Sequence, residues 1–495
     1  MSLSKLTAGL IMAIVLINSA DLRGDDAEIA RFEKRLKLSK LSDHMICGGA
    51  PSRADLAFLA RTRGITRVIS LLDPSAEVDQ EAADAKDLGV AFESKPLAIG
   101  LDGPLDQARI NRDVARSIID EIRATTDGTV YVHCQSGRDR AGFMRFAHRV
   151  TVDGWSFADA LQEALDGGFS PTKLPGFYRD MKLFMSELDE LPKVAAMPIT
   201  DKELNSKEMT AGIGAQSLNV KLMGEGSPLY VIHGGPGESH KMFRPYLDEL
   251  SKSHKLVYYD QVGCGGSSKP QFAEAYTLER QVEELEALRK VAEHEKISLI
   301  AQSSGCLIAM KYALAHPDRV DKMVLVSGWA SAEEFQKYIP VLVSVMGETD
   351  REKYDWLIGE LRKAMRGPND RELVALVGLQ LPGIFFGEVD TAFRLDWLRH
   401  VEVSSYVNIV MEKEVFRTSD LRPELAKITG IPTLVVSGKF DLITPPPLAK
   451  TIADGIPGAK LEVFERSGHY PYVEENRKFI DTVTGFLGGA KAAAE

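Results

Sequence analysis

Two runs of alternating strand and helix patterns, separated by one irregular segment, most constrain how this chain can fold. The separating segment, "LPKVAAMPITDKELNSKEM" at residues 191–209, contains two prolines and many polar residues and has no periodicity. Segments of this kind connect domains. A chain of 495 residues is also too long for one ordinary hydrophobic core. The sequence therefore predicts two α/β domains, at residues 21–195 and 207–490, joined by a linker at 196–206.

In the first domain, apolar runs alternate with helical periodicity. The runs "TRVISLL" and "TVYVHC" indicate buried strands. Between them, "ARINRDVARSIIDEIRATTDG" predicts a helix that ends at Gly128. A second helix begins within "AGFMRFAHRV", so a strand, a short loop and a helix follow one another around Cys134. The apolar face of the first helix holds Ile110, Val114, Ile118 and Ile122.

In the second domain, the alternation is interrupted once. Between Ser331 and about Leu425, helical patterns such as "YDWLIGELRKAM" dominate. This predicts a helical insertion at residues 331–425 within a parallel sheet. Six runs predict the strands of that sheet: "SPLYVIH" (227–233), "KLVYYD" (255–260), "ISLIAQ" (297–302), "KMVLVSG" (322–328), "PTLVVSG" (432–438) and "KLEVFE" (460–465).

Charge and cysteine content argue against several classes of function. A formal net charge of −11 disfavours nucleic acid as a partner. The four cysteines lack both paired CxxC spacing and the density of a disulfide scaffold, so we expect neither a metal site nor a cofactor. These cysteines are Cys47, Cys134, Cys264 and Cys306.

The first residues have the pattern of an export signal. One lysine precedes a mostly apolar run from Leu6 to Ile17, and small or polar residues follow as far as Ala20. The run is short for a membrane span and is typical of a secretory signal peptide at residues 1–20. The alternative is an uncleaved anchor, because Asn18 is a poor residue three positions before the cut. We expect a periplasmic or secreted protein, with no stable membrane insertion after cleavage.

The loop "HCQSGRDR", between a predicted strand and helix, is suited to holding a phosphate. A turn that leads into a helix N-terminus offers backbone N–H groups to an anion, and its positive field favours a cysteine thiolate. The residues predict that Cys134 attacks phosphorus while Arg140 and the loop amides stabilise the developing charge. The candidate phosphate ligands are Gln135, Ser136, Gly137, Arg138, Asp139 and Arg140.

This loop and the upstream "ICGGAPSRADLAFLARTRGITRVISLLDP" resemble the bacterial dual-specificity-like, cysteine-based tyrosine phosphatases. The resemblance covers about residues 40–190. It implies hydrolysis of phosphotyrosine-like or other phosphate monoesters, with a phosphate monoester or a phosphoprotein as partner. It also implies a general acid on a preceding loop.

Asp102 stands where the resemblance places the general acid, and Asp106 and Asp139 are the second and third choices. One position departs from the family. Ala141 replaces the Ser or Thr whose hydroxyl helps the thiolate leave the phosphoenzyme. The alternative prediction is therefore a phosphate-binding module that does not turn over.

The stretch "LIAQSSGCLIAM" has the strand–turn–helix pattern of a nucleophile elbow, which needs small residues two positions before and after the serine. Ser303 is flanked at these positions by Ala301 and Gly305. Ser304 would be flanked by Gln302 and Cys306, which fit less well. The pattern therefore favours Ser303 as the nucleophile.

The partners of Ser303 follow in the order acid, then base. Asp441 comes directly after a predicted strand in "VVSGKFDLITP", and His469 lies in "ERSGHYPYVEE" after the next strand. In this order His469 would accept the serine proton and Asp441 would hold the tautomer of the ring. The "HGGPG" stretch predicts the oxyanion hole, with Gly235 and Ser304 as the candidate N–H donors.

In this order "HGGPG", "DQVGCGGSSKP", "AQSSGC", "KFD" and "GHYPYVEE" resemble the proline iminopeptidase family of α/β-hydrolases over about residues 207–490. The resemblance implies a helical cap and release of an N-terminal residue, often proline, from a small peptide. It also implies that cap carboxylates bind the free amine. The candidates are Glu412 and Glu414, with Glu388 and Asp390 as others.

Three functions fit these patterns. The first is a fused enzyme with a serine aminopeptidase and a phosphatase. The second is a general ester, amide or lactone hydrolase that carries a phosphate-binding module without turnover. The third is a binding protein with both sites inactive, and the complete set of Ser303, Asp441 and His469 argues against it.

Overall fold

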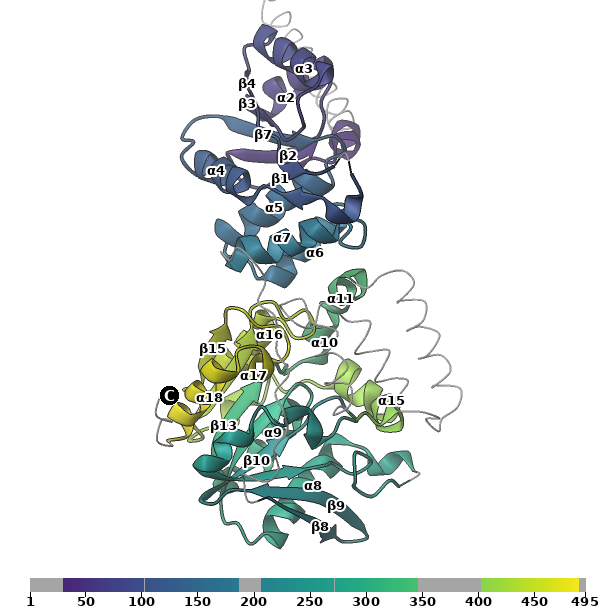
Figure 1. The fold of residues 1–495 in the computed structure, drawn as a ribbon, viewed down its shortest axis with the longest axis vertical. Coiled ribbons are helices and arrows are strands. Elements are labelled where there is room, and N and C mark those ends of the chain that lie inside the picture. The colour runs from purple at the N-terminus through teal and green to yellow at the C-terminus, as the bar shows by residue number, and fades with distance from the viewer. Residues whose placement is uncertain (1–29, 102, 187–205, 271, 346–401, 489–495) are drawn as a thin grey trace, which may run out of the picture. The chain divides into compact units, whose positions relative to one another are not determined.

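A computed structural model describes residues 30–101, 103–186, 206–270, 272–345 and 402–488 (Figure 1). The predicted signal peptide lies outside these residues, as does almost all of the predicted linker. The chain divides into two compact units, residues 1–155 with 160–185, and residues 156–159 with 186–495. Among the described residues, no helix is long and apolar enough to cross a membrane.

The first unit is built on a five-stranded sheet in the order β1-β2-β7-β3-β4. Only β1 is antiparallel to its neighbour. Helices α2 and α3 pack on one face, and α5 contacts β2 and β7 from the other (Figure 1). The strands are β1 (Ser39–Lys40), β2 (Met45–Gly49), β3 (Ile65–Ser70), β4 (Ala91–Ser94) and β7 (Thr129–Cys134), with β5 (Ala98–Ile99) and β6 (Arg109–Ile110) forming a separate pair. The helices are α2 (Arg53–Arg63), α3 (Ala76–Asp87), the 3-10 turn η1 (Leu105–Gln107), α4 (Arg112–Arg123), α5 (Asp139–Thr151), α6 (Phe157–Asp166) and α7 (Pro175–Ser186).

The helix expected to end at Gly128 is α4, and it is shorter than the apolar pattern predicted. It begins after Asn111, whose side chain accepts the Val114 N–H at 3.2 Å and so caps the helix. Ile110 precedes the helix in β6, where its N–H donates to the Asp180 carboxylate at 2.7 Å. The sequence pattern included Ile110 because this residue, which lies before the N-cap Asn111, has the same spacing as the apolar face of the helix.

The second unit is built on an eight-stranded sheet in the order β15-β14-β13-β12-β10-β11-β9-β8. Strands β10 to β15 are parallel, and all six lie within two residues of the predicted positions. The antiparallel strands β8 and β9 at one edge were not predicted. The strands are β8 (Lys207–Ile213), β9 (Gln216–Met223), β10 (Ser227–Ile232), β11 (His254–Tyr259), β12 (Ile297–Gln302), β13 (Val320–Val326), β14 (Thr433–Gly438) and β15 (Lys460–Phe464).

Both faces of this sheet are buried, because successive strand residues enter two different clusters. In β10, Tyr230 and Ile232 join one cluster, whereas Leu229 and Val231 join the other. The first cluster contains residues of α8 (Leu278–Val291), α9 (Gly305–Ala315) and α16 (Pro446–Gly455), and the second contains residues of α17 (Pro471–Glu474) and α18 (Asn476–Leu487). The remaining helical turns are η3 (His240–Phe243), η4 (Asp248–Lys252), η5 (Ala273–Ala275), η6 (Pro317–Arg319) and η8 (Leu425–Lys427).

The predicted cap is described only at its two ends. Helices α10 (Ala332–Gln336) and α11 (Ile339–Val345) begin it, and α15 (Ser405–Lys413) with the π-helical turn η7 (Glu414–Thr418) ends it. Residues 346–401, which include Glu388 and Asp390, lie outside the described residues.

Candidate active sites

Ser303 lies in the sharp turn between β12 and α9, and its backbone is left-handed, with φ +55°. Such a conformation is uncommon for a residue with a side chain. The turn packs closely on the neighbouring strand, since a Cβ at Gly305 would lie 2.7 Å from the His233 carbonyl oxygen. The Ser303 N–H donates to the Val326 carbonyl at 2.9 Å. Ser304, by contrast, has ordinary helical angles at the N-terminus of α9. The elbow geometry is therefore at Ser303.

Asp441 and His469 form the buried acid–base pair predicted for this site. His469 Nδ1 lies 2.8 Å from Asp441 Oδ2, and both side chains are almost fully buried. Asp441 Oδ1 accepts the N–H groups of Ile443 at 2.8 Å and Thr444 at 2.9 Å. Burial opposes ionisation of Asp441, but the charge of His469 and these hydrogen bonds outweigh it and lower its pKa. Asp441 therefore stays ionised and fixes the tautomer of the ring.

Thr444 completes this pair and was missed by the sequence analysis. Its hydroxyl oxygen lies 2.8 Å from Asp441 Oδ2, 2.8 Å from the Ser327 carbonyl oxygen and 3.1 Å from His469 Nδ1. The Thr444 hydroxyl thus lies within hydrogen-bonding distance of Asp441, of His469 and of Ser327, the residue after β13. The sequence signal was the Asp-x-x-Thr spacing, which is typical of a turn in which the aspartate accepts backbone N–H groups.

The "HGGPG" loop packs directly against the nucleophile. A Cβ at Gly234 would lie 2.8 Å from Ser303 Cβ, so only glycine permits this approach. Gly235, the predicted oxyanion donor, has φ +113°. The loop is held from the cap side, where the Ser404 N–H donates to the Gly237 carbonyl at 2.6 Å and Asn408 donates to the Pro236 carbonyl at 3.0 Å.

Asp260 holds His240, which follows the "HGGPG" loop in η3. Its Oδ1 lies 2.7 Å from His240 Nδ1 and accepts the His240 N–H at 2.9 Å. Its Oδ2 accepts hydrogen bonds from Asn219 at 2.9 Å and from the Gly266 N–H at 3.0 Å. Asp260 of the "DQVGCGG" stretch therefore connects the segment after this loop with Asn219 of β9.

Glu238 follows this loop directly, and the sequence analysis also missed it. The side chain is half-buried and folds back toward Gly235, because a Cβ there would lie 3.3 Å from Glu238 Cγ. Within the described part of the chain, no hydrogen bond or ion pair engages its carboxylate. Burial raises the pKa of Glu238 to about 7, although the nearby charge of His469 lowers it. The sequence signal was a charged residue inside a glycine-rich loop.

Glu412 and Glu414, the candidate amine-binding carboxylates within the described residues, both interact with other groups of the protein. Glu412 pairs with Arg417 at 2.7 Å. Glu414 accepts the Leu278 N–H at 3.2 Å, and burial together with Glu279 raises its pKa. Neither contact involves a residue of the triad.

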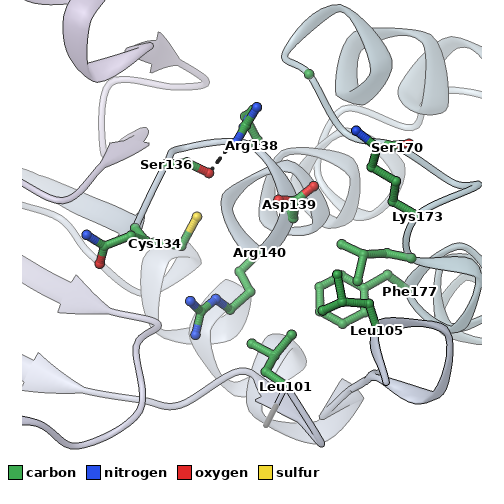
Figure 2. Close-up of a pocket in the computed structure, with 13 residues that line it drawn as sticks. Leu101, Leu105, Cys134, Ser136, Arg138, Asp139, Arg140, Ser170, Lys173 and Phe177 are labelled. Atoms are coloured by element: carbon green, nitrogen blue, oxygen red, sulfur yellow. Dashed lines mark hydrogen bonds between the residues drawn. The ribbon is translucent and has the colours of Figure 1, made fainter. Parts of the chain in front are cut away.

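In the first unit, the loop from Cys134 to Arg140 joins β7 to α5 and borders a pocket of about 330 Å³. Figure 2 shows the Cys134 sulfur directed into this pocket, with Asp139 beside it. Gly137 has φ +67°, and a Cβ there would lie 2.8 Å from the Gly49 nitrogen. The pocket is lined by Leu101, Leu105, Cys134, Gln135, Ser136, Arg138, Asp139, Arg140, Gly168, Ser170, Lys173, Leu174 and Phe177.

Arg140 is anchored at the side of this pocket. Its guanidinium donates to the Leu71 carbonyl at 3.2 Å and lies 3.5 Å from Asp73 Oδ2. Asp139 is a half-buried carboxyl that lines the pocket, and burial raises its pKa against the effect of four nearby cations. Asp102, the first choice for the general acid, lies outside the described residues. Asp106 is in η1, and its side chain is also outside them.

The role of Thr444 can be tested by removing its hydroxyl without changing its shape. We expect Thr444→Val to lower kcat for a p-nitrophenyl ester by about ten-fold, because one hydrogen bond to a charged group is lost. Thr444→Ser keeps the hydroxyl and should retain nearly full activity. Equal rates for the two variants would show that the hydroxyl does not position the pair.

Comparisons with known proteins match the second unit. The family model described as alpha/beta hydrolase fold matches residues 227–371. The proline iminopeptidase of Clostridioides difficile is 33% identical over 270 residues, which cover 52% of this chain and 89% of that protein. The proline iminopeptidase of Lactobacillus crispatus is 31% identical over 278 residues, which cover 53% of this chain and 90% of that protein. A solved structure, the esterase EaEST from Exiguobacterium antarcticum, is 23% identical with a TM-score of 0.46, covering 57% of this chain and 98% of that one.

The expected fold and family of the second domain are confirmed by these relatives together with the parallel sheet and the elbow at Ser303. Through its second unit, the chain belongs to the α/β-hydrolase family that includes the proline iminopeptidases.

Proposed function

We propose that the second unit is a serine aminopeptidase that releases an N-terminal residue, proline in particular, from small peptides. The observation that carries this proposal is the Glu238 carboxylate, which lies near enough to His469 to feel its charge and has no hydrogen bond or ion pair within the described residues. A half-buried carboxylate without a cation partner is poised to accept one, and the ammonium group of a peptide N-terminus is such a cation. The relatives named proline iminopeptidase support the same substrate class.

The reaction follows from the roles of the buried groups. His469 takes the proton of the Ser303 hydroxyl as the oxygen attacks the carbonyl carbon of the first residue. The oxyanion is stabilised by the backbone N–H groups of Gly235 and Ser304. His469 then gives its proton to the leaving amine as the C–N bond breaks, and water hydrolyses the acyl-enzyme. Asp441 stabilises the imidazolium throughout.

A general ester or amide hydrolase is the alternative for this unit, and Glu238 distinguishes the two. Glu238→Gln keeps the size of the side chain but removes its charge. We expect kcat/KM for prolyl p-nitroanilide to fall about 10- to 100-fold, the value of one charge-assisted hydrogen bond. Hydrolysis of p-nitrophenyl acetate, which has no amine, should change by less than about three-fold.

Glu412→Gln provides the matched comparison, because it removes a carboxylate that the sequence placed at the amine site. Loss of the prolyl activity in this variant but not in Glu238→Gln would assign amine binding to the cap. A wild-type chain that hydrolyses only the ester would refute the aminopeptidase itself.

For the first unit, we propose hydrolysis of phosphate monoesters. This proposal is supported by the position of Cys134 at the end of β7, facing a pocket that Arg140 borders and into which α5 directs its N-terminus. The Cys134 thiolate would attack phosphorus and displace the alkoxide, which Asp139 or Asp102 protonates. Water would then release phosphate from the cysteine. Ala141 provides no hydroxyl for this second step, so binding without turnover is the alternative.

Independence of the two sites is tested with paired nucleophile variants. Cys134→Ser should abolish hydrolysis of p-nitrophenyl phosphate under reducing conditions and leave the prolyl activity unchanged. Ser303→Ala should have the opposite effect. A wild-type chain that binds phosphate but does not hydrolyse the ester would establish the binding module, and loss of both activities in either variant would contradict two separate sites.

A further inference from the structure

The pocket beside Cys134 contains more positive charge than one phosphate group requires. Arg140 closes the loop, and Arg138 and Lys173 line the pocket (Figure 2). A fourth cation, Lys37, acts on Asp139 together with these three. The excess is notable in a chain with 71 acidic and 60 basic residues.

The side chains of Lys37 and Arg138 both lie next to Gly168. A Cβ at Gly168 would lie 2.9 Å from Arg138 Cδ and 3.7 Å from Lys37 Nζ. Arg138 is oriented by its own loop, because its Nε donates to Ser136 Oγ at 3.3 Å. Lys37 is held in a left-handed backbone conformation, with φ +51°, which is uncommon for lysine.

The one carboxyl of the described residues that acts on all of these cations is the half-buried Asp139. In the described ranges, no carboxylate lies within ion-pair distance of Lys37, Arg138 or Lys173. By contrast, the neighbouring Lys40 is paired with Asp43 at 2.8 Å. Arg138 and Lys173 line the pocket, and Lys37 lies beside Gly168, which also lines it. These three exposed cations, which form no ion pair within the described residues, repel one another, and an anionic ligand would relieve that repulsion.

We infer that Lys37, Arg138 and Lys173 form a second anion subsite, and that the pocket takes a ligand with two phosphate groups. One phosphate occupies the loop at Cys134 and Arg140, and the other lies between the three cations. A second phosphate gains charge-assisted hydrogen bonds that a monophosphate does not make. The inference goes beyond the proposed hydrolysis, because binding at this subsite needs no turnover.

The apolar side of the pocket indicates which kind of carbon framework would connect the two phosphate groups of the ligand. Leu101, Leu105 and Phe177 lie together there, and Leu105 is 51% exposed (Figure 2). An exposed leucine beside a polar loop is suited to an apolar ligand surface. The ligand class is therefore a bisphosphate on an aromatic or other apolar carbon framework.

The test measures binding to the full chain carrying Cys134→Ser, so that no ligand is consumed. The probes are phenyl phosphate and the 1,3- and 1,4-phenylene bis(phosphates), titrated by calorimetry at a fixed salt concentration. We expect at least one bis(phosphate) to bind about 10- to 100-fold more tightly than phenyl phosphate. Adding Lys37→Gln or Lys173→Gln should remove most of this preference and change the affinity for phenyl phosphate by less than about three-fold.

Lys40→Gln is the matched control, because it removes a nearby positive charge that is already paired. It should leave the preference for the bis(phosphate) intact. The inference is overturned if the bis(phosphates) and phenyl phosphate bind equally, if no probe binds, or if all three lysine variants weaken every probe alike. Tight bis(phosphate) binding by a wild-type chain that hydrolyses no phosphate ester would refute the proposed phosphatase and leave the subsite in place.

Discussion

The left-handed backbone at Ser303 is the constraint on which the second unit depends. For a residue with a side chain, this conformation costs about 1–3 kcal/mol, and the interactions of the surrounding structure must offset that cost. Here β12 is fixed between parallel neighbours, and α9 starts where Gly305 meets the His233 carbonyl. Because Gly234 also packs on the Ser303 side chain, the nucleophile and the oxyanion loop are positioned by the same close contacts. The strain is thus maintained by a sheet that is buried on both faces.

Both units place a candidate nucleophile, Cys134 or Ser303, at the carboxyl end of a central parallel strand, where ligands of α/β sheets commonly bind. The charged side chains around the two positions are of opposite sign. Around Ser303, the carboxylates of Asp441 and Glu238 provide negative charge, which would favour a bound amine. Around Cys134, four cations surround Asp139 and favour phosphate. On the proposed functions, these charges would select different substrates at two otherwise similar positions.

The parallel strands β10 to β14 could be predicted because strands buried on both faces are largely apolar runs. The edge strand β15 ("KLEVF") is only partly buried, and its alternation of polar and apolar residues predicted it. The edge strands β8 and β9 could not be predicted, since "KEMTAGI" and "QSLNVKLM" mix polar and apolar residues. Ser303, Asp441 and His469 could be named as candidates because each follows a strand within a short motif, and Cys134 because it ends one. Four other residues could not be predicted, because only folding brings each of them beside residues of another segment. They are Thr444, Glu238, Lys37 and Lys173.

The account rests most directly on Ser303 as the single activated serine of the second unit. A fluorophosphonate reagent transfers its phosphonyl group to such a serine, with loss of fluoride, and the modified peptide can be identified by mass spectrometry. We predict one adduct per chain, on the Ser303 oxygen, and no adduct in Ser303→Ala. An adduct on Ser304, or no adduct in a chain that hydrolyses aryl esters, would contradict the central claim.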